Sequence, residues 1–251
     1  MTIPIPELAT LFVLCFARVG TLVMLLPGIG ERAIPARMRL SLALLLALAV
    51  FPVARTLMPA TPSPQLLVAT LIGEICVGLV LGLATRAVTA ALQAAGTIAA
   101  QQLGLSYATT VDPSFGGQDV AIGNFLVLLG VTLVFATDLH HLAITAIRDS
   151  YALLPPVGLP DVGDATKLAI TAVARGFALG VRIAAPFIVF AILFNLGLGV
   201  LSRLMPQMQV FFIGLPLTIM IGMLILLAAL GLMMAVYLGD LRDFLGEIGG
   251  R

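Results

Sequence analysis

The sequence predicts an all-α, polytopic membrane protein, and three observations support this fold class. Hydrophobic residues make up 61% of the 251 residues and charged residues only 10%, whereas soluble domains have about 25% charged residues. The mean hydropathy is +1.16. Apolar runs of about eighteen or more residues recur along the chain, and each can cross a hydrocarbon core of about 30 Å as a helix. These runs leave no room for a separate soluble domain, so we expect residues 1–251 to form a single domain.

Proline, glycine and arginine residues separate the apolar runs and divide the chain into segments. We expect six hydrophobic segments: Ile5–Pro27, Leu40–Met58, Leu66–Ala100, Val120–Ile147, Leu168–Val200 and Val210–Leu238. The third and the fifth exceed the length of one crossing, so each is expected to tilt, kink or leave the membrane. Pro186 is a candidate for a kink in the fifth segment.

The basic residues between the segments give no clear orientation. We assumed six crossings with both termini in the cytoplasm and compared the loops, because Lys and Arg prefer cytoplasmic loops. The cytoplasmic loops would then hold Arg55, Arg148, Lys167, Arg242 and Arg251, and the opposite loops Arg32, Arg37, Arg39 and Arg203. This near balance suggests that the segments are not threaded through lipid in the usual way.

The C-terminal residues, about 236–249, have the pattern of an amphipathic helix. Its apolar residues recur at helical spacing and are Tyr237, Leu241, Phe244, Leu245 and Ile248. Charged residues occupy the positions between them. Two interpretations remain open: a helix lying on lipid headgroups, or a helix that docks on a partner.

Six ionisable residues interrupt the apolar segments: Arg18, Glu74, Arg86, Asp138, Arg175 and Arg182. Each would cost about 3 kcal/mol at the centre of a bilayer, or about 18 kcal/mol for the set, which exceeds a typical folding stability of about 5–15 kcal/mol. Most of these buried charges must therefore face other helices, a water-filled path or the membrane boundary. Glu74 and Asp138 could form a proton relay, but the near balance of acids and bases favours internal ion pairs.

Small residues are spaced for close helix packing in the third segment. Gly78 and Gly82 form a GxxxG pattern, which lets two helices approach closely. Such a pattern is common in polytopic proteins and identifies no function.

No pattern in the chain indicates an enzyme, a cofactor, a metal or a nucleic-acid partner. The net charge is +1, and basic residues do not cluster as a nucleic-acid surface requires. The sequence contains no nucleotide-binding GxxxxGK[ST] loop, and Ser106 is not followed by the glycine of a GxSxG motif. His140 and His141 are adjacent, so on a helix their side chains point about 100° apart, unlike the i, i+4 pair of a metal site.

The loop between the third and fourth segments, residues 106–119, combines turn residues with apolar ones. Its distinctive residues are Ser106, Tyr107, Val111, Asp112, Pro113, Phe115, Gly116 and Gly117. Irregular backbone at membrane depth is tolerated only where protein buries it or where it lines a cavity. We therefore expect this loop to fold back into protein as a plug.

The order of several short motifs resembles the FliR/SctT family of type III secretion export-gate subunits over nearly the full length. The early motifs are Arg18-Val19-Gly20 with Pro27 and Pro35, Gly73-Glu74 with Gly78 and Gly82, and Gly104-Leu105-Ser106-Tyr107-Ala108 before Val111-Asp112-Pro113. The later ones are His140 or His141 with Ser150 and Pro155, Ala185-Pro186, Asn195, Gly199, Arg203 with Pro206-Gln207-Met208, Val210-Phe211, Gly214 and Pro216. Gln209 departs from the asparagine more usual in the family.

The resemblance implies hydrophobic helical hairpins, similar to a fusion of FliP and FliQ, within a helical export-gate assembly. It implies FliP, FliQ and FlhB as partners, unfolded flagellar proteins as substrates, and contact with lipid in the bacterial inner membrane at the flagellar basal body. It also makes residues 106–119 the plug of a closed pore. Two alternatives are a homologue from a virulence secretion system, and a secondary transporter of a small solute or ion with Glu74, Asp138 and Arg182 at a midplane site.

Overall fold

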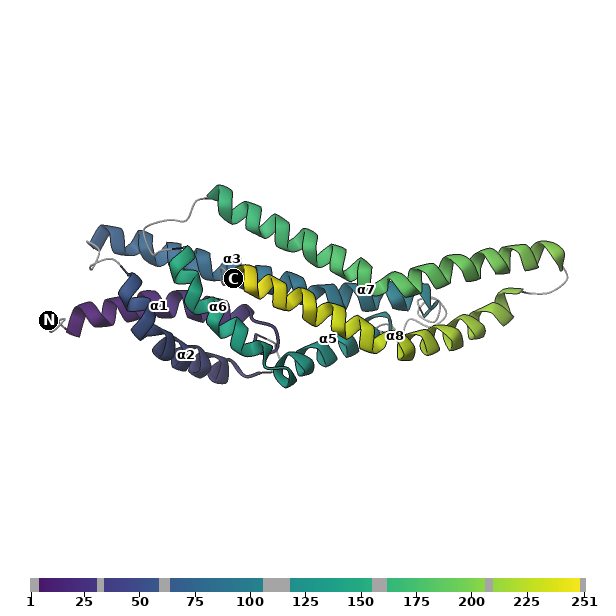
Figure 1. Ribbon diagram of the computed structural model, residues 1–251, viewed down its shortest axis with the longest axis horizontal. Helices are drawn as coiled ribbons and strands as arrows, with labels where there is room; N and C mark the ends of the chain where they lie inside the picture. Colours follow the sequence, from purple (N-terminus) through teal and green to yellow (C-terminus); the bar gives the residue numbers. More distant parts are fainter. Residues whose placement is uncertain are drawn as a thin grey trace. The chain divides into compact units, whose positions relative to one another are not determined.

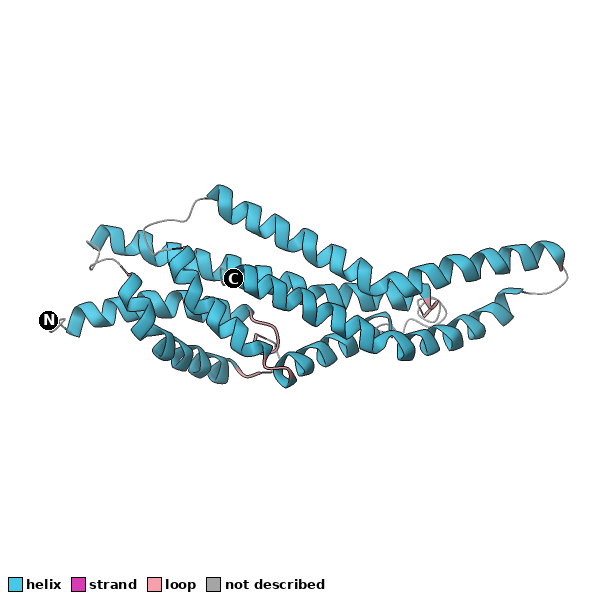
Figure 2. Ribbon diagram, in the orientation of Figure 1, coloured by secondary structure: helices cyan, strands magenta, loops and turns pink. Residues whose placement is uncertain are grey.

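The computed structural model describes residues 5–30, 34–58, 64–105, 118–154, 162–205 and 210–248 (Figure 1). These residues form α1 (Ile5–Leu25), α2 (Ala36–Leu57), α3 (Pro64–Gln102), α5 (Gln118–Ala136), α6 (Leu139–Leu153), α7 (Val162–Leu204) and α8 (Val210–Ile248). Within these ranges every regular element is a helix (Figure 2).

The helices are long and apolar enough for a polytopic membrane protein. Five of the described helices qualify as membrane spans by length and composition, and a bent helix pair would make a sixth. The predicted fold class, an all-α polytopic membrane protein, is confirmed. In the apolar window of α2 and in that of α8, only 22% of the residues are buried by the chain itself.

Local sequence explains where α2 and α3 begin and end. Pro35 lies directly before α2 in an extended conformation. Proline has no backbone N–H, so it is tolerated at the start of a helix, whereas inside a helix it removes a backbone hydrogen bond. Gly104 follows α3 with φ 75°, and the amide of Leu105 donates to the carbonyl of Ala100 over 3.1 Å. This is the glycine-terminated helix end in which a left-handed residue turns the chain out of the helix.

The fourth predicted segment, Val120–Ile147, is not one helix. The chain bends between α5 and α6 at Asp138, which has φ 58°. Neither proline nor glycine marks this break, so the apolar pattern alone suggested a continuous helix. Aspartate is one of the few residues other than glycine that adopts the left-handed conformation readily.

The C-terminal residues also differ from the prediction, because they continue α8 and are packed within the chain. Leu241, Phe244 and Leu245 are buried, and Leu245 lines a small apolar cavity with Leu22 and Leu81. Both interpretations, a helix on headgroups and a docking helix for a partner, are therefore wrong for this apolar face. Sequence periodicity shows that a face is apolar but not what covers it.

The described chain forms two compact units. The first comprises residues 1–88, 134–174 and 241–251, and the second residues 89–133 and 175–240. In the first, α2 packs against α1 and α6, around a core that includes Val19, Val23, Ala47, Ile147 and Tyr151. In the second, the most buried large residues include Leu92, Leu126, Phe187 and Tyr237. The helices α3, α7 and α8 each extend from one unit into the other. The division into two units does not decide how many domains the chain has, so a single domain over residues 1–251 stays a prediction.

Candidate functional site

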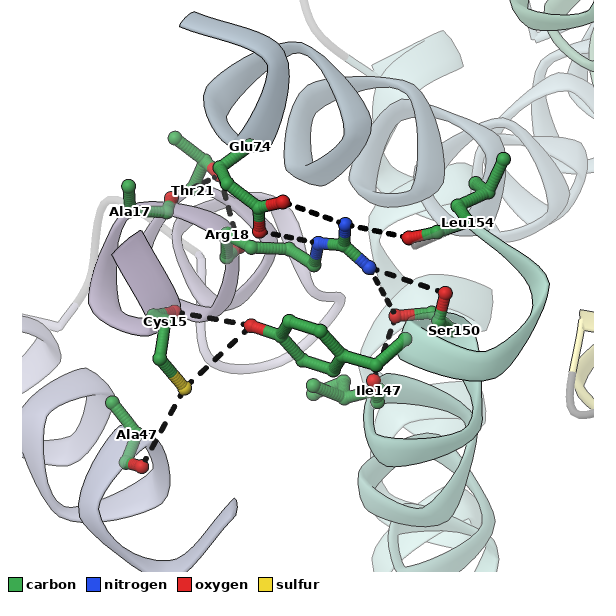
Figure 3. Close-up of polar contacts among 10 residues, drawn as sticks. Cys15, Ala17, Arg18, Thr21, Ala47, Glu74, Ile147, Ser150 and Leu154 are labelled. Atoms are coloured by element: carbon green, nitrogen blue, oxygen red, sulfur yellow. Dashed lines mark hydrogen bonds and ion pairs between the residues drawn. The ribbon is translucent and has the colours of Figure 1, made fainter. Parts of the chain in front are cut away.

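A buried ion pair joins α1 to α3 in the first unit. Arg18 is fully buried and Glu74 is 1% exposed. The guanidinium of Arg18 donates from Nε to Oε2 of Glu74 over 2.7 Å and from Nη2 to Oε1 over 2.8 Å (Figure 3). This two-pronged geometry matches the planar fork of arginine to the two carboxylate oxygens.

The same guanidinium also binds the C-terminal end of α6. Its Nη1 donates to the carbonyl of Ser150 over 3.1 Å, and its Nη2 donates to the carbonyl of Leu154 over 2.8 Å (Figure 3). The last carbonyls of a helix have no partner within the helix and carry partial negative charge. Arg18 thus satisfies both an acidic side chain on α3 and the free end of α6.

Every N–H group of Arg18 has an acceptor in this cluster. Besides the contacts above, Nη1 lies 3.4 Å from the hydroxyl oxygen of Ser150. That hydroxyl donates its own proton to the carbonyl of Ile147 over 2.7 Å. The guanidinium carbon lies 4.1 Å from the ring centroid of Tyr151, within reach of a cation–π interaction. A buried arginine is tolerated only when its charge and its five donors are satisfied in this way.

This geometry favours an ion-paired role for Glu74 over a role in proton transfer. Both carboxylate oxygens accept from one guanidinium, and the side chain is 2% exposed. A relay also needs a partner to receive the proton, but Asp138 has a side chain that is 76% exposed. The two carboxylates therefore do not share an enclosed path in this unit.

Gly78 and Gly82 face α1 at close range next to the ion pair. A Cβ atom at Gly78 would collide with Oγ1 of Thr21 and lie 2.6 Å from the carbonyl oxygen of Arg18. A Cβ atom at Gly82 would lie 2.7 Å from Cβ of Leu25. The GxxxG pattern thus lets α3 approach α1 closely enough for Glu74 to reach Arg18.

A second ion pair lies in the other unit, between α7 and α8. Nε of Arg175 lies 2.9 Å from Oδ2 of Asp240, and Nη2 donates to the carbonyl of Asp240 over 3.2 Å. The two side chains are 21% and 15% exposed. Asp240 is one of the charged residues between the apolar positions of the predicted C-terminal helix, and the sequence gave no signal that it pairs with Arg175.

The remaining predicted buried charges are not buried within the chain. Arg86 and Arg182 are exposed and make no ion pair within the described part of the chain, and Asp138 lies in the exposed break before α6. What these three side chains face outside the chain, whether other helices, a water-filled path or the membrane boundary, stays a prediction. An apolar sequence neighbourhood shows the helix on which a charge lies but not the face that carries it, and long arginine side chains can extend away from an apolar surface.

The predicted plug lies outside the described residues at Ser106, Tyr107, Val111, Asp112, Pro113, Phe115, Gly116 and Gly117, while Gln118 and Asp119 begin α5. Pro206 and Gln207 also lie outside them.

The other family-motif positions are helical. Pro186 is inside α7, Asn195 is exposed on it, and Arg203 lies in its last turn. Pro216 is inside α8, and a Cβ atom at Gly214 would lie 2.9 Å from the side chain of Leu198.

The structure brings together three potential metal ligands that the sequence did not group. Asp138, His140 and His141 place one ligand atom each within 4.8 Å of one another. The two imidazole centroids lie 4.1 Å apart, with 35° between the ring planes. The expectation that adjacent histidines diverge is therefore wrong here, because side-chain rotation compensates for the 100° step of the helix. A short Asp-x-His-His motif was the available signal.

Comparison with known proteins gives a consistent result. The family model described as bacterial export proteins, family 1, matches residues 9–244. The chain is 44% identical to the flagellar biosynthetic protein FliR of Caulobacter vibrioides over 92% of this chain and 93% of that protein. It is 31% identical to FliR of Escherichia coli over 86% and 82% of the two chains, and 29% identical to FliR of Bacillus subtilis over 92% and 90%.

Proposed function

Because the chain belongs to the bacterial export proteins, family 1, with the flagellar FliR proteins, we propose that it is a non-enzymatic core subunit of the pore in the flagellar type III export gate. The chain is a membrane-embedded component of the flagellar export apparatus. The finer proposal is that it assembles with FliP and FliQ, contacts FlhB, and conducts unfolded flagellar proteins. We place this assembly in the bacterial inner membrane, at the flagellar basal body.

The exposed apolar surface of α7 is the observation that carries this proposal. Large apolar side chains are exposed from Ile170, at 65%, to Leu204, at 73%. At 1.5 Å per residue this stretch is about 51 Å long. A helix needs only about 39 Å to cross a 30 Å hydrocarbon core even at a tilt of about 40°. One crossing of lipid therefore does not account for the whole of this surface, which supports the proposal that further protein buries part of it.

Copurification tests this assembly. The chain, tagged and coexpressed with FliP and FliQ, is expected to elute from size-exclusion chromatography as one particle that contains all three. Expressed alone, it is expected to aggregate, because its apolar helices are left without their protein cover. A single chain that is monodisperse and transports a small solute in plain lipid vesicles would contradict the proposal and support a secondary transporter.

Deletion of Val111–Phe115 tests the plug. We expect the particle to assemble normally but to conduct ions or small solutes when reconstituted, because the deleted residues include apolar side chains that would fill the lumen. Conductance across a planar bilayer is the measurement. A control deletes the three residues 249–251, which follow the last described residue of α8. Conductance equal to that of the wild type would remove the plug assignment.

A further inference from the structure

The break between α5 and α6 carries a cluster of metal-ligating groups that neither the ion pairs nor the proposed pore uses. Asp138 occupies the N-cap position of α6, and His140 and His141 lie in its first turn. The carboxylate Oδ1 of Asp138 lies 3.8 Å from Nδ1 of His141. One ligand atom from each of the three residues lies within 4.8 Å of the others. These separations leave space for one cation to be bound by all three.

The unpaired nitrogen of His140 is an independent observation at this cluster. Its Nδ1 is enclosed and has no hydrogen-bond partner among the described residues. The centroid of the His140 ring lies 5.2 Å from that of Phe135 and 4.1 Å from that of His141. Buried polar nitrogens in proteins nearly always have a partner. His140 thus has a free imidazole nitrogen on a ring that lies beside a second imidazole, and this supports a missing ligand at the cluster.

The chemistry of the three donors selects a class of ion. Imidazole suits Zn²⁺, Cu²⁺, Ni²⁺ and Fe²⁺, whereas Ca²⁺ and Mg²⁺ prefer sets of oxygen ligands. Two imidazoles and one carboxylate form an open three-ligand set, and water would complete the coordination. We propose that Asp138, His140 and His141 form a binding site for a divalent transition-metal ion.

The backbone at Asp138 contributes to this site. Its φ of 58° places an aspartate in the left-handed turn that begins α6. The N-terminus of α6 carries partial positive charge and opposes a bound cation, so the carboxylate is needed to offset that charge as well as to coordinate. Side-chain exposures of 76% for Asp138 and 68% for His141 leave the cluster accessible to ions.

Zinc binding to the assembled particle tests the site. The chain contains only two histidines, so His140→Ala/His141→Ala removes all of its imidazole. The particle is purified through a tag that contains no histidine, equilibrated with micromolar Zn²⁺, and analysed for bound zinc by mass spectrometry. We expect the double variant to bind about one Zn²⁺ fewer per copy of this chain than the wild type.

The variant Asp138→Asn removes the carboxylate ligand but keeps the left-handed turn, since asparagine also adopts positive φ readily. Loss of an outer-shell partner already weakens metal binding by about 10–100-fold, so loss of this ligand should weaken zinc binding by at least about tenfold. Asp149→Asn is the matched control, because Asp149 lies on the same helix but pairs with Arg148 at 2.7 Å. It should bind zinc as the wild type does.

Chemical protection gives a second measurement that does not depend on the variants folding. In the wild-type particle, diethyl pyrocarbonate should modify the histidines, and Zn²⁺ but not Mg²⁺ should slow this reaction severalfold, as read by peptide mass spectrometry. Equal zinc content in the wild type and an intact double variant would overturn the proposal. Modification at the same rate with and without Zn²⁺ would overturn it as well.

Discussion

Replacing Glu74 with leucine is expected to lower the free energy of unfolding by about 3–5 kcal/mol, because it leaves the fully buried charge of Arg18 without its counter-ion. The carbonyls of Ser150 and Leu154 remain as acceptors, but two neutral oxygens do not balance a formal charge. The measurement is the denaturant concentration at which the coexpressed particle loses this subunit. Arg86→Leu is the matched control on the same helix, since Arg86 is exposed.

The double variant Arg18→Leu/Glu74→Leu distinguishes a missing counter-ion from a general packing defect. Apolar replacement of both members of a buried pair is often close to neutral, whereas removal of one is not. We therefore expect the double variant to recover a large part of the stability that Glu74→Leu loses. If it is as unstable as the sum of the two single variants, the ion pair is not the cause of the loss.

Replacing Gly78 and Gly82 together with leucine is expected to prevent recovery of a folded, assembled subunit. Atoms of Thr21, the Arg18 backbone and Leu25 already occupy the space into which side chains at these positions would extend. One of these obstacles is a carbonyl oxygen 2.6 Å from the Cβ position at Gly78, so rotation of a side chain cannot relieve the collision. Overpacking by even small groups typically costs about 1–3 kcal/mol.

Alanine substitutions test close packing more finely, because the change in stability should have a different sign at crowded and at open glycine positions. Gly78→Ala should destabilise the subunit, measured again as the denaturant midpoint of the coexpressed particle. Gly231→Ala and Gly239→Ala are controls on α8, where a Cβ atom meets nothing within 4 Å, and each should be neutral or stabilise the helix by about 0.5–1 kcal/mol. Similar losses at all three sites would contradict close packing at Gly78.

The sequence was sufficient for the fold class and for the position of most helices. Long apolar runs such as Ile5–Pro27 and Val210–Leu238 became α1 and most of α8, because length and hydropathy are properties of a single segment. The break at Asp138 was missed because it depends on one backbone angle rather than on composition. Proline gave no reliable boundary either, since Pro52, Pro186 and Pro216 all lie inside helices.

The candidate site was only partly accessible from sequence for a different reason. The cost of buried charge predicts that Arg18 and Glu74 need partners, but it does not specify which ones. Arg18 pairs with Glu74, which lies 56 residues away along the chain, and with Ser150, which lies 132 residues away. Local sequence patterns do not encode contacts at such separations. The pairing of Arg175 with Asp240 is likewise set by how α7 and α8 pack. Hydropathy assigned Arg86 and Arg182 to apolar segments without resolving the helix face.

The distance along the chain between Arg18 and its acceptors affects how the protein is made. Ribosomes add about 5–20 residues per second, so Arg18 is synthesised about 3–11 s before Glu74, which follows 56 residues later. During that interval α1 carries an arginine with a cost of about 2.5–3.5 kcal/mol for lateral transfer into lipid. The nascent segment should therefore remain at the insertion machinery, or at the membrane surface, until α3 emerges and the two helices can enter as a pair.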